Sequence, residues 1–227
     1  MLLFSLECSA AAASAAIYRD EKLLGEEFLN VPQTHSVTLL PMAKSLLEHT
    51  GISPAQIDYY AVSRGPGSFT GLRIGIAAIK GLAFPDNTPC IGVSTPEAIA
   101  YGLLGFEGTV IPMMDARCGQ VYTALFQGKD GRLTRLSEDE ALPLSELKEK
   151  LKSCTGPLWL CGDGAHLGLA AWGEELPVRM APAHLCCQRA SAVGLAAMQH
   201  LGEAVSPAAL VPCYLRPANA MTLAERQ

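Results

Sequence analysis

The chain carries little positive charge with which to hold a nucleic acid. Its 227 residues include 17 lysines and arginines against 22 aspartates and glutamates, which gives a net charge of −5, and no run of basic residues. A protein that binds RNA phosphates unaided usually shows a basic stripe. We therefore expect that this chain does not bind RNA tightly by itself.

Metal-binding patterns are also missing. The eight cysteines form no C-x-x-C pair, and the adjacent Cys186 and Cys187 match no metal motif. The five histidines, at positions 35, 49, 166, 184 and 200, are never three to five residues apart. A protein metal site needs several converging ligands. These patterns predict buried thiols, isolated histidines and no metal site.

No apolar run reaches the length needed to span a membrane. The chain begins with Met-Leu-Leu-Phe-Ser-Leu, but Glu7 interrupts this run and no basic residue precedes it, unlike a secretion signal. We expect a cytoplasmic protein with no membrane partner. With 49% hydrophobic residues, the chain can bury the core of one large domain or two small ones.

The most informative segment is rich in glycine. Residues 64–75 read RGPGSFTGLRIG, after an apolar run and before a segment with apolar residues at helical spacing. The first two glycines permit a tight turn, Pro66 ends the preceding strand, and Ser68 or Thr70 can cap a helix. The pattern predicts a strand, a tight turn and a helix.

This loop does not match the common phosphate-binding motifs. Its G-x-G-x-x-x-G spacing is one residue longer than the dinucleotide fingerprint, and no Gly-Lys-Ser/Thr follows as in a Walker loop. A helix start attracts anions in general. An ordinary strand-to-helix turn explains the same residues equally well.

The helix predicted for residues 71–83 has two apolar faces. One face should cover the core, and the other is nearly bare, with Gly71, Gly75, Ala78 and Leu82 in a row. Glycine inside a helix costs about 1 kcal/mol relative to alanine, so a close contact should compensate. That contact is either with another protein or with a neighbouring helix of the same chain.

The stretch from Gly65 to Gly75 resembles the signature of the bacterial TsaB (YeaZ) family. These are tRNA threonylcarbamoyladenosine biosynthesis proteins of the actin-like ATPase superfamily. Four shorter pieces agree with the family in the same order, so the resemblance spans almost the whole chain. They are Val93-Ser-Thr-Pro-Glu-Ala98, Asp115-Ala-Arg117 with Val121-Tyr122, Gly162-Asp-Gly-Ala165 and Tyr214-Leu-Arg216.

The expected elements follow one order twice, with a restart after the linker 105–108. The first half has strands at 2–7, 14–19, 22–29, 57–63 and 90–94 and helices at 36–49, 71–83 and 96–104. The second has strands at 109–115, 121–127, 132–137 and 157–161 and helices at 145–153, 165–172 and 187–200.

This order predicts an α/β protein with two β-β-β-α-β-α lobes, residues 1–105 and 106–207. It matches the duplicated actin-like ATPase (ASKHA) fold that the resemblance implies. In that fold the tail, residues 208–227, would return to the first lobe.

The resemblance also indicates where a nucleotide would lie. In the actin-like fold its phosphates sit between the lobes, at turns that correspond here to Glu7-Cys-Ser9 and Asp115-Ala-Arg117, with a later loop at 162–164. The first turn runs into four alanines, which offer little to a triphosphate and its magnesium. Glu7, Ser9, Asp115 and Gly162 are therefore weak candidates, and ATP or ADP would bind only weakly or at a partner interface. Alternatively, Glu7 and Asp115 cap turns and hold the lobes together.

A catalytic role is not expected for this chain alone. The family is similar to the catalytic subunit TsaD, whose His-x-x-x-His pair supplies metal ligands. The matching positions here are Thr95 and Ile99, and isoleucine cannot bind a metal. The chain also lacks the G-x-S-x-G nucleophile motif.

The resemblance implies a non-catalytic subunit that binds and stabilises a TsaD-like protein. Together with a TsaE-like ATPase, the complex would add a threonylcarbamoyl group to N6 of the adenosine next to the anticodon, in tRNAs that read codons beginning with A. This chain would meet tRNA only through the complex. The alternative is an ATP-dependent kinase or a peptidase-like hydrolase that acts at the cleft.

The partner interface is expected on the bare face of the helix at 71–83 and on the helix beside it. Arg73 and Lys80 are seven residues apart and would pair with acidic groups at the rim. An apolar surface left open tends to bind a copy of itself, so we expect a homodimer when the partner is absent. The nine candidate residues are Leu39, Ala43, Leu46, Gly71, Arg73, Gly75, Ala78, Lys80 and Leu82.

Overall fold

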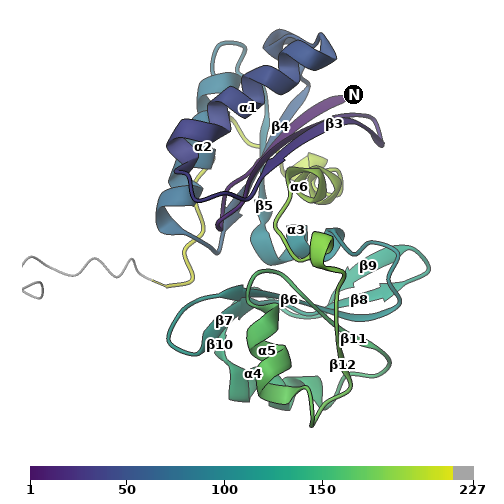
Figure 1. Ribbon diagram of the computed structural model, residues 1–227. Coiled ribbons are helices and arrows are strands. Elements are labelled where there is room, and N and C mark those ends of the chain that lie inside the picture. Colours follow the sequence, from purple (N-terminus) through teal and green to yellow (C-terminus); the bar gives the residue numbers. More distant parts are fainter. Residues whose placement is uncertain (217–227) are drawn as a thin grey trace, which may run out of the picture.

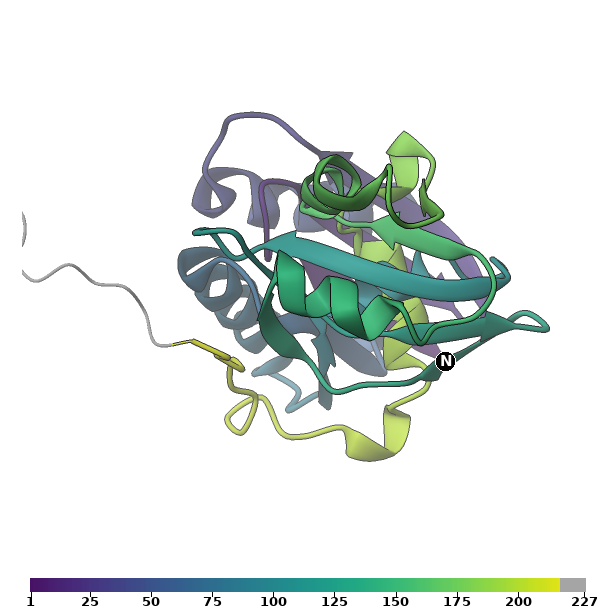
Figure 2. The same cartoon turned by 90° about the horizontal axis from the view of Figure 1, so that it is seen from below.

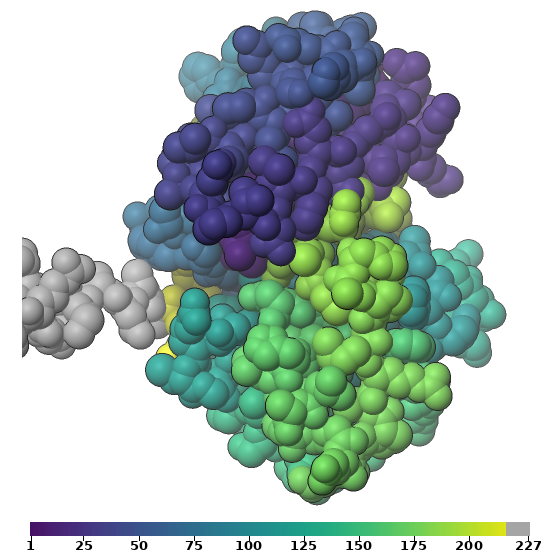
Figure 3. Space-filling model, viewed as in Figure 1, coloured from purple at the N-terminus to yellow at the C-terminus, as the bar shows by residue number. Residues whose placement is uncertain are grey.

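A computed structural model describes residues 1–216 of the protein. It contains two β-sheets in two lobes, and helices cover the faces of both (Figure 1). In the space-filling view the two lobes are stacked, and the green residues around α6 (Ala190–Ala197) lie between them (Figure 3). No helix within residues 1–216 combines the length and apolar character needed to cross a membrane.

The first lobe is built on a five-stranded sheet with the order β3-β2-β1-β4-β5. The central strand β1 pairs antiparallel with β2 and parallel with β4. The strands are β1 (Leu2–Glu7), β2 (Ala13–Arg19), β3 (Lys22–Leu29), β4 (Tyr59–Gly65) and β5 (Cys90–Ser94). The helices are α1 (His35–Thr50), α2 (Phe69–Ala83) and α3 (Thr95–Tyr101), with a short 3-10 turn at Pro54–Gln56.

Both faces of the first sheet are covered at its central strand β1. Successive side chains of a strand point to opposite faces, so neighbouring residues of β1 pack against different helices. Phe4 packs under α1 and α2, whereas its neighbour Leu3 packs under α3 and α6. A central strand covered on both sides reads as a continuous apolar run. In β1 all residues after Leu2 are buried, including the polar Ser5 and Glu7.

The second lobe repeats the sheet order of the first, as β10-β7-β6-β11-β12. A β8–β9 hairpin is added where β8 pairs with β6. The strands are β6 (Gly108–Asp115), β7 (Gln120–Thr123), β8 (Phe126–Lys129), β9 (Arg132–Arg135), β10 (Glu140–Pro143), β11 (Leu158–Cys161) and β12 (Val178–Met180). The helices are α4 (Leu144–Leu151), α5 (Ala165–Trp172) and α6, with 3-10 turns at Ala183–Leu185 and Leu201–Glu203.

The duplicated fold is confirmed, with more strands than the sequence predicted. All five strands of the first lobe were expected, whereas in the second lobe the run at 121–127 forms two strands, and β10 and β12 were not expected. The helix expected at 187–200 is shorter, since α6 covers only Ala190–Ala197.

The C-terminal part of the chain, from α6 onward, returns to the first lobe. The sequence-based division placed α6 in the second lobe, but α6 packs on the first sheet, where Val193 joins Leu3 and Tyr18 in one buried cluster. The chain then runs along the first lobe as far as residue 216 (Figure 2, yellow), and Cys213 N–H donates to Arg64 O at 2.7 Å. The expectation for the tail also covers residues 217–227, which lie outside the described residues.

Candidate functional site

The floor of the cleft between the lobes holds one fully buried carboxyl group, that of Glu7 at the end of β1. It accepts hydrogen bonds from the Ser63 hydroxyl on β4 and from the Ser9 backbone N–H. Burial raises the pKa of Glu7, although these hydrogen bonds and the nearby His35 act in the opposite direction. Glu7 therefore ties the turn after β1 to the neighbouring strand.

A pocket of about 470 Å³ lies above this floor, between the turn after β1, the start of α2 and the end of β6. Both of its carboxylates are held by the chain itself. Asp115 accepts a hydrogen bond from Arg117 N–H at 2.8 Å, and Asp163 accepts one from Gln188 Nε2 at 2.6 Å. Burial also raises the pKa of Asp163, although the hydrogen bond from Gln188 lowers it. The described contacts leave one buried hydroxyl in this pocket without a partner, that of Ser9.

The described residues of this cleft offer few free polar side chains to a nucleoside triphosphate and its magnesium. The first turn contributes Ala10 and Ala11, whose side chains have no polar atoms, and the carboxylates are already engaged. Gly162 serves the fold, because its φ is 92° and a Cβ there would lie 2.3 Å from Met113 O. In the described contacts, Glu7, Asp115 and Gly162 each hold a turn of the chain in place.

The positions compared with metal ligands lie at the start of α3, between the lobes. Thr95 is buried, and Ile99 packs with Met114 and Phe126 of the second lobe. Within residues 1–216, no group of three or more histidine, cysteine, aspartate or glutamate side chains could hold a metal ion.

Gly71 and Gly75 of α2 face the same chain. A Cβ on Gly71 would lie 2.1 Å from Cys8 O, and a Cβ on Gly75 would lie 2.7 Å from Cys8 Sγ. The bare stripe lets α2 approach the end of β1 in the same chain. The prediction that these two glycines lie on an open interface is therefore wrong.

Most other residues of the predicted interface also serve the chain itself. Arg73 lies over the ring of Phe69, and Lys80 Nζ donates to Ala208 O at 3.2 Å, so both side chains contact neighbouring parts of the chain. Leu82 is half-buried at the surface. The remaining four candidates are buried, because they point from α1 and α2 toward the first sheet: Leu39, Ala43, Leu46 and Ala78.

The exposed apolar surface of these helices consists mainly of other residues, although Ala43 and Leu82 from the predicted interface line an open groove beside it. On α1, Val37 is 64% exposed and Leu40 is 51% exposed, and Phe84, just after α2, is 74% exposed. Beside them lies an open groove of about 960 Å³ between α1, the turn after it and the end of α2. We call this the α1–α2 groove. It is lined by Leu40, Pro41, Leu47, Ile52, Pro54 and Leu82.

The sequence contained a signal for this surface. Val37, Leu40 and Pro41 stand at helical spacing i, i+3 and i+4, on the side of α1 opposite the buried row of Leu39, Ala43 and Leu46. A helix that is apolar on two sides has one face for the core and one for something else.

Two lobes that repeat one sheet order around a central cleft define the duplicated actin-like ATPase fold. A family model described as "TsaD: tRNA N6-adenosine threonylcarbamoyltransferase" matches residues 29–154. The tRNA threonylcarbamoyladenosine biosynthesis protein TsaB of Bacillus subtilis is 31% identical over 97% of this chain and 96% of its own length. For TsaB of Escherichia coli the identity is 34%, over 72% of each chain.

A solved structure of YeaZ from Pseudomonas aeruginosa superposes with a TM-score of 0.78 at 27% identity, and the match covers 94% of this chain and 99% of the other. The chain belongs to the TsaB (YeaZ) family.

Proposed function

We propose that this chain is a non-catalytic subunit that binds and stabilises a TsaD-type protein in the synthesis of threonylcarbamoyladenosine in tRNA. Membership of the TsaB family supports the pathway. The observation that carries the subunit role is the α1–α2 groove with the exposed Leu40 and Phe84 beside it. Contiguous exposed apolar surface of this kind marks sites of protein–protein contact.

The fold itself suggests what would cover the groove. The TsaD family model matches residues 29–154, which include α1 and α2. A TsaD-type partner would therefore present helices equivalent to these two. Two related molecules can then pair like surfaces around an approximate twofold axis, as in an isologous dimer.

In this assembly the TsaD-type partner performs the chemistry. It transfers the threonylcarbamoyl group to N6 of the adenosine next to the anticodon, in tRNAs that read codons beginning with A, and a TsaE-type ATPase completes the complex. This chain meets tRNA only within the complex, in keeping with its net charge of −5. It holds no triphosphate by itself, and ATP or ADP would bind only weakly or at the junction with the partner.

The alternative, an ATP-dependent kinase or a peptidase-like hydrolase, has less support. One serine–histidine–glutamate contact exists on the surface, where Ser45 Oγ lies 3.5 Å from His49 Nδ1 and Glu27 Oε1 lies 3.8 Å from that same nitrogen. A catalytic triad needs the serine and the acid on opposite nitrogens of the imidazole. This cluster therefore cannot relay a proton to or from a nucleophile.

The subunit role is tested with a matched pair of surface variants. Leu40 in the groove and Leu136 on the second lobe are 51% and 52% exposed. A charge buried in an apolar contact is costly, so Leu40→Glu should weaken binding to a TsaD-type protein by about tenfold or more, whereas Leu136→Glu should not. Binding is measured by size-exclusion co-elution and titration, and threonylcarbamoyl transfer is measured with and without each variant.

Full binding by Leu40→Glu would show that the groove is not the interface. If the unmodified chain neither binds the partner nor raises transfer, the subunit role itself is wrong. Transfer by the chain without any partner would instead favour an enzyme.

A further inference from the structure

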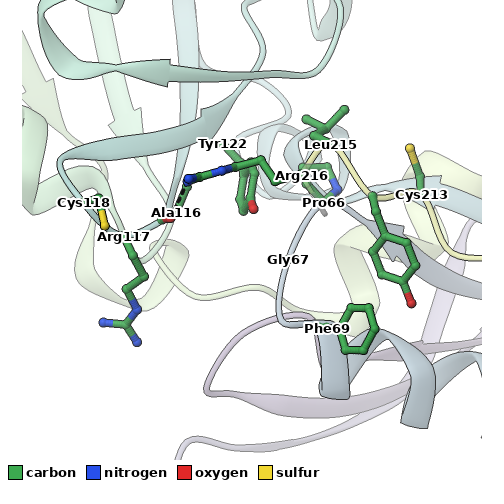
Figure 4. Close-up of a pocket in the computed structure, with 11 residues that line it drawn as sticks. Pro66, Gly67, Phe69, Ala116, Arg117, Cys118, Tyr122, Cys213, Leu215 and Arg216 are labelled. Atoms are coloured by element: carbon green, nitrogen blue, oxygen red, sulfur yellow. Dashed lines mark hydrogen bonds between the residues drawn. The ribbon is translucent and has the colours of Figure 1, made fainter. Parts of the chain in front are cut away.

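A second, smaller pocket adjoins the interlobe cleft and brings distant motifs together (Figure 4). Its volume is about 180 Å³. It is lined by residues 66–69 at the start of α2, by the turn after β6 at 116–118, and by the tail at 213–216. These are three of the segments that carry the family resemblance, and none of them lines the α1–α2 groove.

One wall of this pocket is a pair of aromatic rings. The centroids of Phe69 and Tyr214 lie 5.0 Å apart, with the ring planes inclined at 31°. The Arg73 guanidinium lies 3.8 Å from the Phe69 centroid, and Arg73 Nε donates to the Tyr214 hydroxyl at 3.0 Å. Tyr214 is nevertheless 38% exposed. The pair is thus held in place by Arg73 while part of the Tyr214 ring stays accessible.

Positive charge gathers around these rings. Arg216 reaches across to the second lobe, where its Nη1 donates to Ala116 O at 3.1 Å (Figure 4). Arg117 stands on the opposite side of the pocket, and its side chain is 86% exposed. Within the part of the chain that the structure describes, Arg117 pairs with Asp115, and Arg73 and Arg216 have no ion pair. Two arginines, Arg117 and Arg216, thus line one pocket of a chain whose net charge is −5, and Arg73 supports its aromatic wall.

Aromatic rings beside guanidinium groups are the usual means of holding single-stranded nucleic acid. Bases stack on the rings, and arginines contact the phosphates. The pocket is smaller than the roughly 300–1,000 Å³ of a typical small-molecule site. It therefore suits one unit of a larger molecule better than a free nucleoside triphosphate.

We propose that this pocket holds one unstacked nucleotide of a single-stranded tRNA segment while the tRNA is bound to the assembled complex, with the base on Tyr214 and a phosphate near Arg117 or Arg216. The inference rests on the proposed function. A contact with one nucleotide adds affinity to a complex but does not suffice alone, which agrees with the acidic chain.

The base contact is tested in the complex with a TsaD-type protein, using a fluorescein-labelled tRNA anticodon stem-loop and fluorescence anisotropy. Tyr214→Ala removes the ring and should raise the Kd for the RNA at least about fivefold. Tyr214→Phe keeps the ring and loses only the hydroxyl, so its Kd should stay within about twofold of the unmodified complex.

The phosphate contact is tested by the salt dependence of the same binding. Losing one contact to a single strand should reduce the slope of log K against log salt by about 0.7. Arg117→Gln or Arg216→Gln should show this reduction. Arg19→Gln is the control, because Arg19 lies at the exposed end of β2 and does not line the pocket. It removes the same charge and should leave the slope unchanged.

Assembly is followed separately by size exclusion, and thermal melting checks the fold of each variant. Weaker RNA binding by an intact Tyr214→Ala complex supports the proposal. Unchanged RNA binding overturns it. If Tyr214→Ala fails to assemble while the other variants assemble, the pocket contacts protein and the RNA proposal is overturned. Equal affinity of the complex for AMP and for the stem-loop would also overturn the proposal.

If the unmodified chain does not assemble with the partner, the proposed function fails. RNA binding by the pocket is then measured on the isolated chain. Photocross-linking to a 4-thiouridine in the stem-loop, at millimolar protein, should occur and be lost in Tyr214→Ala. Absence of cross-linking to the unmodified chain would overturn the proposal.

Discussion

Single glycines of α2 differ in what surrounds them. A Cβ on Gly71 would meet the carbonyl oxygen of Cys8 at 2.1 Å, whereas a Cβ on Gly81 would meet nothing within 4 Å. Gly71→Ala should therefore lower the free energy of unfolding by about 2–3 kcal/mol through overpacking. Gly81→Ala should raise it by about 0.5–1 kcal/mol through helix propensity.

Urea unfolding of the two variants checks this pair. Both changes add one methyl group to the same helix, so a difference between them reports the surroundings and not the substitution. If Gly71→Ala were as stable as the unmodified chain, α2 would not contact the turn after β1 as described.

Glu7 makes stability depend on pH. Because burial raises its pKa above the ordinary value of 4.5, the folded state holds this proton more tightly than the unfolded state does. The free energy of unfolding contributed by Glu7 is therefore highest below pH 4.5 and falls as the pH rises through the window between the two pKa values. Glu7→Gln carries no such proton and should lack this fall.

The measurement is urea unfolding of both proteins between about pH 4.5 and pH 8. Other titrating groups cancel in the difference between the two proteins, and any constant loss of a hydrogen bond from Ser63 or Ser9 shifts this difference equally at every pH. The difference should move in favour of the glutamine variant as the pH rises. A difference that does not change with pH would contradict the raised pKa.

Local chemistry could be predicted at this scale, and contacts between distant residues could not. The capping role of Ser68 follows from its neighbours, and its hydroxyl accepts a hydrogen bond from Gly71 N–H at 3.2 Å. The spacing of Gly71 and Gly75 showed that something approaches α2 closely, but not that it is Cys8, whose Sγ lies 3.2 Å from Gly71 O. Periodicity identifies a stripe of residues, and only tertiary structure identifies what covers it.

At the scale of elements, α6 is attached to the first sheet by one carboxylate on β3. Glu26 Oε2 accepts hydrogen bonds from two Arg189 nitrogens at 2.9 and 3.1 Å, and Glu26 Oε1 accepts from the Ser191 N–H and hydroxyl. Its side chain is only 10% exposed. Glu26→Gln removes the charge and one acceptor, so it should destabilise the fold by about 2–3 kcal/mol.

The neighbouring Glu27 provides the control for this prediction. Its nearest basic group is the His49 imidazole, whose Nδ1 lies 3.8 Å away, and the His49 side chain is 79% exposed. Glu27→Gln should change the free energy of unfolding by no more than about 0.5 kcal/mol. Equal effects of the two substitutions in urea unfolding would show that Glu26 does not anchor α6.

Elements with strong periodicity were predicted well, and short ones were not. The strand at 2–7, the strand at 22–29 and the helix at 165–172 have the expected bounds. By contrast, β12 has only three residues and depends on pairing with β11, which no local pattern reveals. The run at 121–127 contains no glycine or proline, so the break between β7 and β8 is not visible without their shared partner β6.

At the scale of the whole molecule, the two proposed surfaces use different parts of α2. The α1–α2 groove reaches Leu82 near the end of this helix, whereas the small pocket includes Phe69 at its start. One helix thus connects a surface for a protein partner with a pocket for RNA. A Tyr214 variant should therefore weaken RNA binding without affecting assembly through the groove, which distinguishes failure of the pocket proposal from failure of the subunit role.

The exposed groove also predicts the state of the chain when no partner is present. Val37, Leu40 and Phe84 project from α1 and from the end of α2, and an apolar surface left open tends to pair with a copy of itself. We expect a concentration-dependent homodimer in sedimentation experiments. Leu40→Glu should abolish the dimer, while the equally exposed Leu136→Glu should preserve it.

Because a TsaD-type partner would cover the same face, adding it should convert the homodimer into a complex with one copy of each chain. A monomer at high concentration would show that the chain does not self-associate. A dimer that persists in Leu40→Glu would place the self-association elsewhere on the molecule. A dimer that binds the partner without dissociating would show that the two contacts use different faces.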